Sequence, residues 1–153
     1  MVPHDTPPDT ALRLERTIAA PPERVFDAWA TPQGLSRWFA PTDEYTSEVS
    51  RLELRVGGRW RLTMRHKGGN SSTVGGVYQE IDRPNRLVFT FQWENDTPPG
   101  EMLVTVEFHA AGTGTRLVLI HERCTSADSR IAHEKGWTGC LARLVAQMAV
   151  EAR

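Results

Sequence analysis

The sequence predicts an α+β fold in which a long helix near the end of the chain covers one face of an antiparallel sheet. From about residue 44, apolar and polar residues alternate with a period of two through six short segments, as in half-buried strands. Turns containing glycine, asparagine or proline separate these segments, which is typical of antiparallel neighbours. After "CTSAD" (124–128), apolar residues recur at helical spacing to about Val150.

One strand and two short helices are predicted before the alternating region. "LRLERTIAA" (12–20) alternates moderately, so we expect a strand that brings the sheet to seven strands. "PPERVFDAWA" is predicted to be a helix, because proline suits a first turn and Glu23 complements the helix dipole. "TPQGLSRWF" is predicted to be a second helix with Thr31 as its N-cap.

The six alternating segments give the sheet one apolar face. In "RWRLTMR", Trp60, Leu62 and Met64 face one way and the arginines face the other, where solvent accommodates their charge. A sheet with one apolar face needs a cover, and the final helix is the only predicted element long enough to provide it. The predicted strands are SEVSRLELRV, RWRLTMR, TVGGVYQEI, RLVFTFQW, EMLVTVEFH and TRLVLIHE.

The final helix contains two glycines beside a tryptophan, in "HEKGWTGCLARL". A glycine inside a helix costs about 1 kcal/mol relative to alanine, so two of them need a reason. Gly136 and Gly139 lie three residues apart and share a side of the helix, whereas Trp137 points toward the sheet's interior or its mouth. The glycines either allow another backbone to approach closely, which we favour, or form the wall of a hollow.

The composition restricts the class of protein. The chain has 153 residues and a net charge of −1, which predicts one domain, over 12–153, and no nucleic-acid partner. Residues 1–11 are rich in proline and polar residues, and we expect a disordered lead-in. The sequence has no apolar run of about 18 residues and no secretory signal, so we expect a cytoplasmic protein that does not insert into membranes. Its two cysteines are expected to be free thiols.

Five segments resemble one family in their order and spacing over about residues 12–150. They are APPERVFDAWATPQGLSRWFAP, LELRVGGRWRLTMR, VYQEIDRPNRLVFTFQW, GTRLVLIHE and HEKGWTGCLARL. The family is the homologues of the activator of the heat-shock chaperone ATPase, within the START-like (SRPBCC) superfamily. The resemblance implies a helix-grip fold, in which a curved seven-stranded antiparallel sheet, with two small helices at one end, carries a long terminal helix across its concave side.

The same resemblance implies a function in small-molecule binding. Members of the superfamily typically enclose a deep apolar cavity between helix and sheet and bind lipids, sterols, polyketides or plant hormones, and a minority are cyclases or lyases. The eukaryotic co-chaperones of the family carry an additional docking domain, for which this chain has no room, so a chaperone partner is not expected. We expect a small hydrophobic or amphipathic ligand and no cofactor.

Inward-facing apolar and aromatic residues are the candidate ligand-binding set. Each of them alone is explained by ordinary core packing, but together they suit a pocket lined by aromatic side chains. The candidates are Trp38, Phe39, Trp60, Met64, Tyr78, Phe89, Phe91, Trp93, Leu119, His121, Trp137 and Leu141.

An enzyme is the alternative, with His121, Glu134 and Tyr78 as acid–base groups. His121 ends an inward row, Glu134 lies near Trp137 on the final helix, and Tyr78 shares a strand face with Glu80. These groups would converge on the cavity if that strand face points inward. The simpler interpretation is that His121 and Glu134 hydrogen-bond each other, or a backbone group, and tie the helix to the sheet.

Other site classes receive less support. His121 and Cys124 are two potential metal ligands, but no third ligand with suitable spacing is evident, so no metal site is predicted. The sequence contains no phosphate-binding loop, dinucleotide fingerprint or nucleophile-elbow motif. Val88, Val118 and Ile120 fall on the outer side of their strands, where an apolar patch would suit a homodimer, although isolated surface valines are common.

Overall fold

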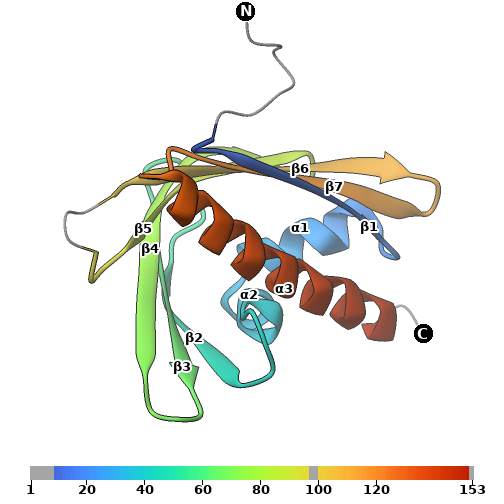
Figure 1. The fold of residues 1–153 in the computed structure, drawn as a ribbon. Coiled ribbons are helices and arrows are strands. Elements are labelled where there is room, and N and C mark those ends of the chain that lie inside the picture. Colours follow the sequence, from blue (N-terminus) through green and yellow to red (C-terminus); the bar gives the residue numbers. More distant parts are fainter. Residues whose placement is uncertain (1–8, 97–99, 152–153) are drawn as a thin grey trace, which may run out of the picture.

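The structure is a computed structural model that describes residues 9–96 and 100–151. The predicted disordered lead-in, residues 1–11, lies mostly outside these ranges. Within the described residues the chain forms a seven-stranded antiparallel sheet and three helices, which confirms the predicted fold class (Figure 1). The elements are β1 (Leu12–Ile18), α1 (Pro22–Ala30), α2 (Pro32–Trp38), β2 (Tyr45–Leu52), β3 (Arg59–His66), β4 (Ser71–Asp82), β5 (Arg86–Trp93), β6 (Met102–Ala111), β7 (Gly114–Glu122) and α3 (Ala127–Glu151).

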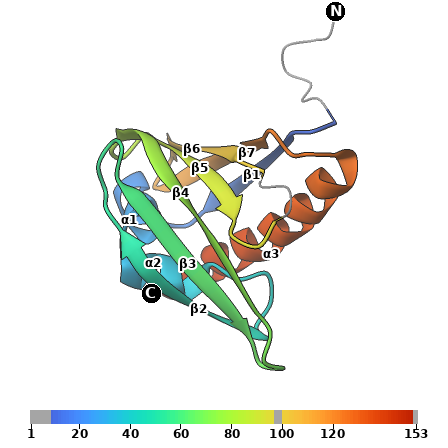
Figure 2. The same cartoon turned by 90° about the vertical axis from the view of Figure 1, so that its left-hand side faces the viewer.

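The strand order is β1-β7-β6-β5-β4-β3-β2. Strands β2 to β7 therefore pair with their neighbours in the sequence, as expected for short turns. Strand β1 pairs with β7, so the first strand lies beside the last one. The view of Figure 2 shows that the sheet curls around α3, which crosses its concave side. The sheet and α3 thus form the two layers that the single apolar face requires.

The two short helices are held by one shared residue and one tryptophan. Thr31 ends α1 and caps α2, because its hydroxyl accepts a hydrogen bond from the Gly34 N–H at 3.1 Å. This confirms the predicted N-cap. The Trp38 indole N–H donates to the Ala28 carbonyl at 2.9 Å, which ties the end of α2 back to α1. The pair forms a rigid unit that closes one end of the curled sheet.

The core follows the alternation in β3, but the outer face of the sheet differs from the prediction. Trp60, Leu62 and Met64 are buried, and the arginines beside them are exposed. Val88 and Val118, however, are only 7 % and 2 % exposed. Val118 lies between Glu15 and Glu107 on the neighbouring strands, and Ile120, the third residue of the predicted patch, is half-buried. The three residues therefore form no exposed apolar patch of the kind expected for a homodimer.

Strand β4 departs from strict alternation at a bulge between Tyr78 and Glu80. A bulge adds one residue to a strand and moves the next residues to the opposite face. Tyr78 is consequently buried and Glu80 is exposed, so the two do not share a face as predicted.

The two glycines of α3 serve different purposes. A Cβ atom at Gly139 would overlap the carbonyl oxygen of Pro41, so this glycine permits close packing of α3 against the segment after α2. A Cβ atom at Gly136 would meet no atom of the described residues within 4 Å. Gly136 instead leaves space on the same side of the helix. Gly139 therefore fits the interpretation of close backbone packing, and Gly136 fits the interpretation of a glycine in the wall of a hollow.

The contrast between these glycines predicts opposite effects of the same substitution. We expect Gly139→Ala to lower the free energy of unfolding by about 1–3 kcal/mol, because the backbone of Pro41 must move. We expect Gly136→Ala to raise it by about 0.5–1 kcal/mol, because alanine favours the helix and nothing obstructs its methyl group. Urea denaturation of both variants measures this difference. Shifts of the same sign and size in both variants would contradict the packing difference.

Candidate functional site

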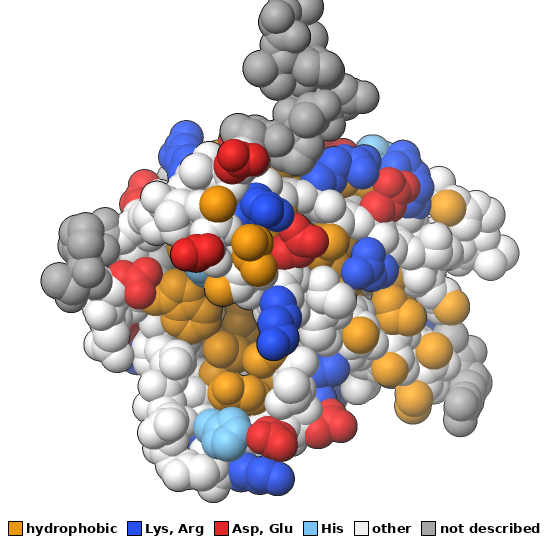
Figure 3. All heavy atoms as spheres, viewed as in Figure 1, with side chains coloured by type: hydrophobic (Ala, Val, Ile, Leu, Met, Phe, Trp, Pro, Cys, Tyr) orange, Lys and Arg blue, Asp and Glu red, His pale blue; other side chains and the backbone are white. Residues whose placement is uncertain are grey.

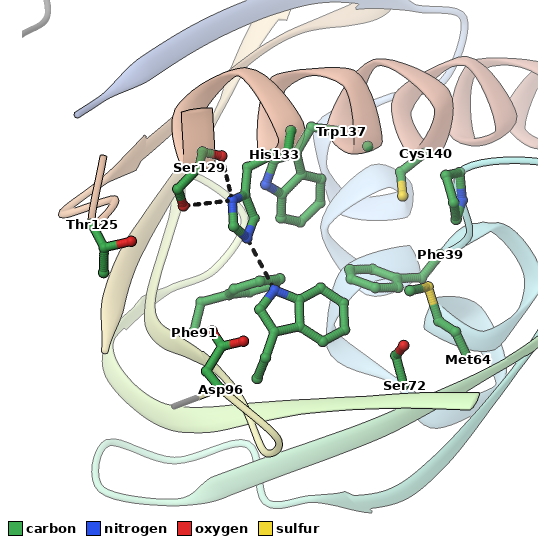
Figure 4. Close-up of a pocket in the computed structure, with 14 residues that line it drawn as sticks. Phe39, Met64, Ser72, Phe91, Asp96, Thr125, Ser129, His133, Trp137 and Cys140 are labelled. Atoms are coloured by element: carbon green, nitrogen blue, oxygen red, sulfur yellow. Dashed lines mark hydrogen bonds between the residues drawn. The ribbon is translucent and has the colours of Figure 1, made fainter. Parts of the chain in front are cut away.

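A cavity of about 620 Å³ lies between α3 and the concave face of the sheet. Figure 3 shows it as a hollow lined by apolar side chains, and Figure 4 shows its wall. Strands β3, β4 and β5 form one side, α3 forms another, and the segment after α2 completes the wall. The lining residues are Phe39, Pro41, Met64, Ser72, Phe91, Trp93, Asp96, Thr125, Ser129, Ala132, His133, Gly136, Trp137 and Cys140.

Aromatic contacts hold the inner wall of the cavity in place. The Trp137 ring stacks on Trp29 of α1 with a centroid separation of 5.8 Å. Phe39 meets Trp137 edge to face at 5.4 Å, and Phe91 packs against it from β5 at 5.7 Å. Edge-to-face and offset contacts of this kind stabilise each other beyond simple burial. The wall is therefore set by side chains from four separate elements.

Two indole–imidazole hydrogen bonds connect α3 to the sheet beside the cavity. The Trp137 N–H donates to His121 Nδ1 at 2.8 Å. The Trp93 N–H donates to His133 Nε2 at 3.0 Å, a bond that Figure 4 draws as a dashed line at His133. The other nitrogens are also engaged, since His133 Nδ1 lies 2.8 Å from the Ser129 carbonyl oxygen and His121 Nε2 lies 3.1 Å from Met102 Sδ. Each ring accepts at one nitrogen and carries its proton at the other, so both imidazoles are neutral in this arrangement.

Burial reinforces the neutral state of His121. Its side chain is inaccessible to solvent, and this loss of hydration, together with the nearby His133, lowers the pKa of His121 to about 3. At neutral pH the ring therefore carries no charge. Its unprotonated nitrogen, Nδ1, accepts the Trp137 N–H, so that lone pair is engaged within the fold.

The three candidate acid–base residues do not converge on the cavity. His121 is buried behind Trp137. Glu134 instead forms an ion pair with Arg130, one turn earlier on α3, at 3.0 Å. Tyr78 lies with Trp60 around a smaller void deeper in the core, where burial raises the pKa of its hydroxyl. The structure therefore does not bring the three candidate acid–base residues together around the cavity. His121 does tie helix to sheet, but through Trp137 and not through Glu134.

The predicted ligand-binding residues fall into three groups. Phe39, Met64, Phe91, Trp93 and Trp137 line the cavity. Trp60, Tyr78 and Phe89 line the smaller void, which Phe39 separates from the cavity. The remaining four do not line the cavity in the described residues and are packed in the core: Trp38, Leu119, His121 and Leu141.

Several lining residues on α3 were not predicted. Ser129, Ala132, His133 and Cys140 face the cavity from the helix that carries Trp137. Gly136, for which the wall of a hollow was one of two interpretations, lines it as well. The signal was present in the sequence, because stepping back four and eight residues from Trp137 gives His133 and Ser129 on the same helix face. The lining residues outside α3 that were not predicted come from loops and a strand end, and no periodic pattern marks them. They are Pro41, Ser72, Asp96 and Thr125.

The curled antiparallel sheet, the two short helices at one end and the long terminal helix across its concave side define a START-like domain with the helix-grip fold. The chain belongs to the family described as "Activator of Hsp90 ATPase homolog 1-like protein", whose model matches residues 19–149. This confirms the resemblance seen in the five sequence segments.

Solved structures of bacterial proteins share this fold over nearly their whole length. A protein from Chromobacterium violaceum has 28% sequence identity and a TM-score of 0.84, with coverage of 91% of this chain and 96% of that chain. The AHSA1 protein from Silicibacter pomeroyi has 30% identity and a TM-score of 0.79, with coverage of 92% and 99%. A protein from Mycobacterium smegmatis has 19% identity and a TM-score of 0.80, with coverage of 94% and 93%, and shows the fold alone.

A search of curated proteins and a search for membrane-spanning helices both gave negative results. No protein with a curated functional description matches the sequence. Among the described residues, every helix is too short or too polar to cross a membrane.

Cys140 gives a chemical test of how well the cavity wall excludes water. Burial raises the pKa of its thiol to about 12, although the residue lines the cavity. In a Cys124→Ser variant, which leaves Cys140 as the remaining thiol, we expect iodoacetamide at pH 8 to react at least about 100-fold more slowly than with the unfolded chain. The rate should rise about tenfold per pH unit up to about pH 10, because only the thiolate reacts.

Mass spectrometry after timed pulses of reagent measures both rates. The same variant in concentrated guanidinium chloride provides the unfolded control. Equal rates in the folded and unfolded chains would mean that Cys140 is hydrated and its pKa ordinary.

Proposed function

We propose that this domain binds a small apolar or amphipathic molecule in the cavity between α3 and the sheet. The observation that carries the proposal is the combination of an aromatic wall with a glycine at a position where a side chain would occupy the cavity. Gly136 lowers the stability of α3 relative to alanine, and the space beside it is part of the hollow. The volume of about 620 Å³ lies within the range common for small-molecule sites.

The distribution of polar groups supports an amphipathic ligand. The inner wall is formed by Phe39, Phe91 and Trp137, against which an apolar body would be buried. The hydroxyl groups of Ser72 and Thr125 and the carboxylate of Asp96 also reach the cavity (Figure 4). These side chains can hydrogen-bond a polar end, while burial of the apolar part contributes about 25 cal/mol per Å² before the cost of association.

Binding is better supported than catalysis or chaperone activation. The imidazoles beside the cavity already use their lone pairs to accept indole N–H groups. The ATPase activation in the family's name calls for a protein-binding surface, whereas a hollow with an aromatic wall suits a small guest.

Filling the space beside Gly136 tests the site directly. We expect wild-type protein to enhance the fluorescence of N-phenyl-1-naphthylamine, a neutral apolar probe, and Gly136→Leu to weaken this binding at least about tenfold because the leucine occupies the probe's volume. Ala142→Leu adds the same side chain to an exposed position of α3 and should bind the probe like the wild type. Fluorescence titration measures the three dissociation constants.

Thermal unfolding of each variant shows whether it remains folded. Equal probe affinity in a folded Gly136→Leu variant and in the wild type would place the binding outside the cavity. Native mass spectrometry of protein purified from its own host then identifies a natural ligand by the mass it adds to the chain.

A further inference from the structure

Three potential metal ligands from separate segments lie together beside the cavity. His121 ends β7, Cys124 follows in the turn, and His133 projects from α3. One donor atom of each lies within 4.8 Å of the donor atoms of the other two. His121 and Cys124 are buried and His133 is half-buried. The sequence analysis identified the first two, and the fold supplies the third, nine residues beyond Cys124.

The turn that places Cys124 is conformationally strained. Arg123 has a φ of 68°, in the left-handed region that residues other than glycine seldom adopt. The backbone N–H of Cys124 donates to the Thr10 carbonyl at 2.9 Å, which fixes the turn against the start of β1. Strain of this kind costs energy and is concentrated at functional sites. Here the strained residue, Arg123, directly precedes Cys124, which is only 5% exposed and lies beside two imidazoles.

We propose that His121, Cys124 and His133 bind a copper(I) ion, with the thioether of Met102 as a fourth ligand. Met102 Sδ lies 3.1 Å from His121 Nε2, so it borders the same group. Thiolate and thioether sulfur favour soft ions, and imidazole binds copper well. Within the described residues the group includes no carboxylate. One thiolate therefore neutralises copper(I) in this buried place, whereas zinc(II) would leave an uncompensated positive charge.

Binding requires small movements and a defined exchange of protons. Ligands held 2.0–2.3 Å from one ion lie within roughly 4 Å of each other, so the three side chains must draw together by less than about 1 Å. Cys124 releases its thiol proton to solvent as the sulfur–copper bond forms, and the oxidation state of copper does not change. His133 can bind through Nε2 and keep its Nδ1–H bond to the Ser129 carbonyl, an arrangement common in metal-bound histidines.

Both indole N–H groups lose their imidazole acceptors when the ion binds. His121 binds the ion through Nε2, the nitrogen that Met102 Sδ borders, so its ring proton moves to Nδ1 and opposes the Trp137 N–H. His133 binds through Nε2, so the ion takes the lone pair that now accepts the Trp93 N–H. Copper(I) should therefore change the tryptophan fluorescence of the protein.

The test is an anaerobic titration of copper(I) against the chromophoric chelator bicinchoninate, with the purified full-length protein. We expect wild-type protein to take one copper(I) per chain and to change its tryptophan emission in step. Losing a residue that only supports a ligand costs about 10–100-fold in metal affinity, so Cys124→Ser should cost at least about 100-fold. Cys140→Ser is the matched control, because Cys140 is the other buried cysteine and is not part of the group.

Two further variants keep the proposal testable if Cys124→Ser does not fold. His133→Gln alters a half-buried position and should also lose copper(I), whereas His109→Gln, at an exposed position of β6, should not. Equal losses in Cys140→Ser and Cys124→Ser, or no binding of one equivalent by the wild type, would overturn the proposal. Tighter binding of zinc(II) than of copper(I) through the same residues would overturn the choice of ion. All of these outcomes are measured without the apolar probe, so failure of the copper site and failure of the ligand cavity can be told apart.

Discussion

The placement of α3 across the concave face of the sheet is the constraint on which the rest of the molecule depends. The sheet has one apolar face, and exposing it would forfeit most of the hydrophobic stabilisation of the fold. At Gly139 the helix packs directly on the carbonyl of Pro41, and this close contact fixes its height above the sheet. One turn earlier, at Gly136, the same side of the helix faces open space. The cavity is thus a consequence of where the helix is held.

The indole–imidazole hydrogen bonds satisfy the polar groups that the placement of α3 buries. Large aromatic rings fill the space between helix and sheet, but a buried indole N–H needs an acceptor. His121 and His133 supply one each, and they do so across elements, from β7 to α3 and from α3 to β5. The bonds therefore join the layers and set the neutral state of both rings. An imidazole used in this way supports the fold and is a poor proton acceptor for a reaction.

The sequence predicted the elements better than it predicted their mutual contacts. Alternation in β3 and the cap at Thr31 depend on neighbours within a few residues, so local pattern was enough. Glu80 faces away from Tyr78 because of a bulge that no local pattern indicated, and the acceptor of the Trp137 N–H lies 16 residues away on another element. As a metal ligand His133 was missed for the same reason, because it joins His121 and Cys124 only when α3 packs against β7.

The proposed ligand cavity and the proposed copper site share Trp93, His133 and Trp137, so they are physically coupled. Without a metal, the imidazoles satisfy both indole N–H groups, and the wall beside them offers an apolar surface to a guest. With copper(I) bound, both indoles lose their acceptors, and an unsatisfied buried N–H is costly. Each indole N–H then needs a new acceptor. The Trp137 N–H points to His121, behind the ring and away from the cavity, whereas the Trp93 N–H points to His133, which lines the cavity. A carbonyl or hydroxyl oxygen of a guest is therefore an acceptor for Trp93 alone. Metal binding would in this way shift the preference of the cavity from purely apolar guests to guests that carry hydrogen-bond acceptors.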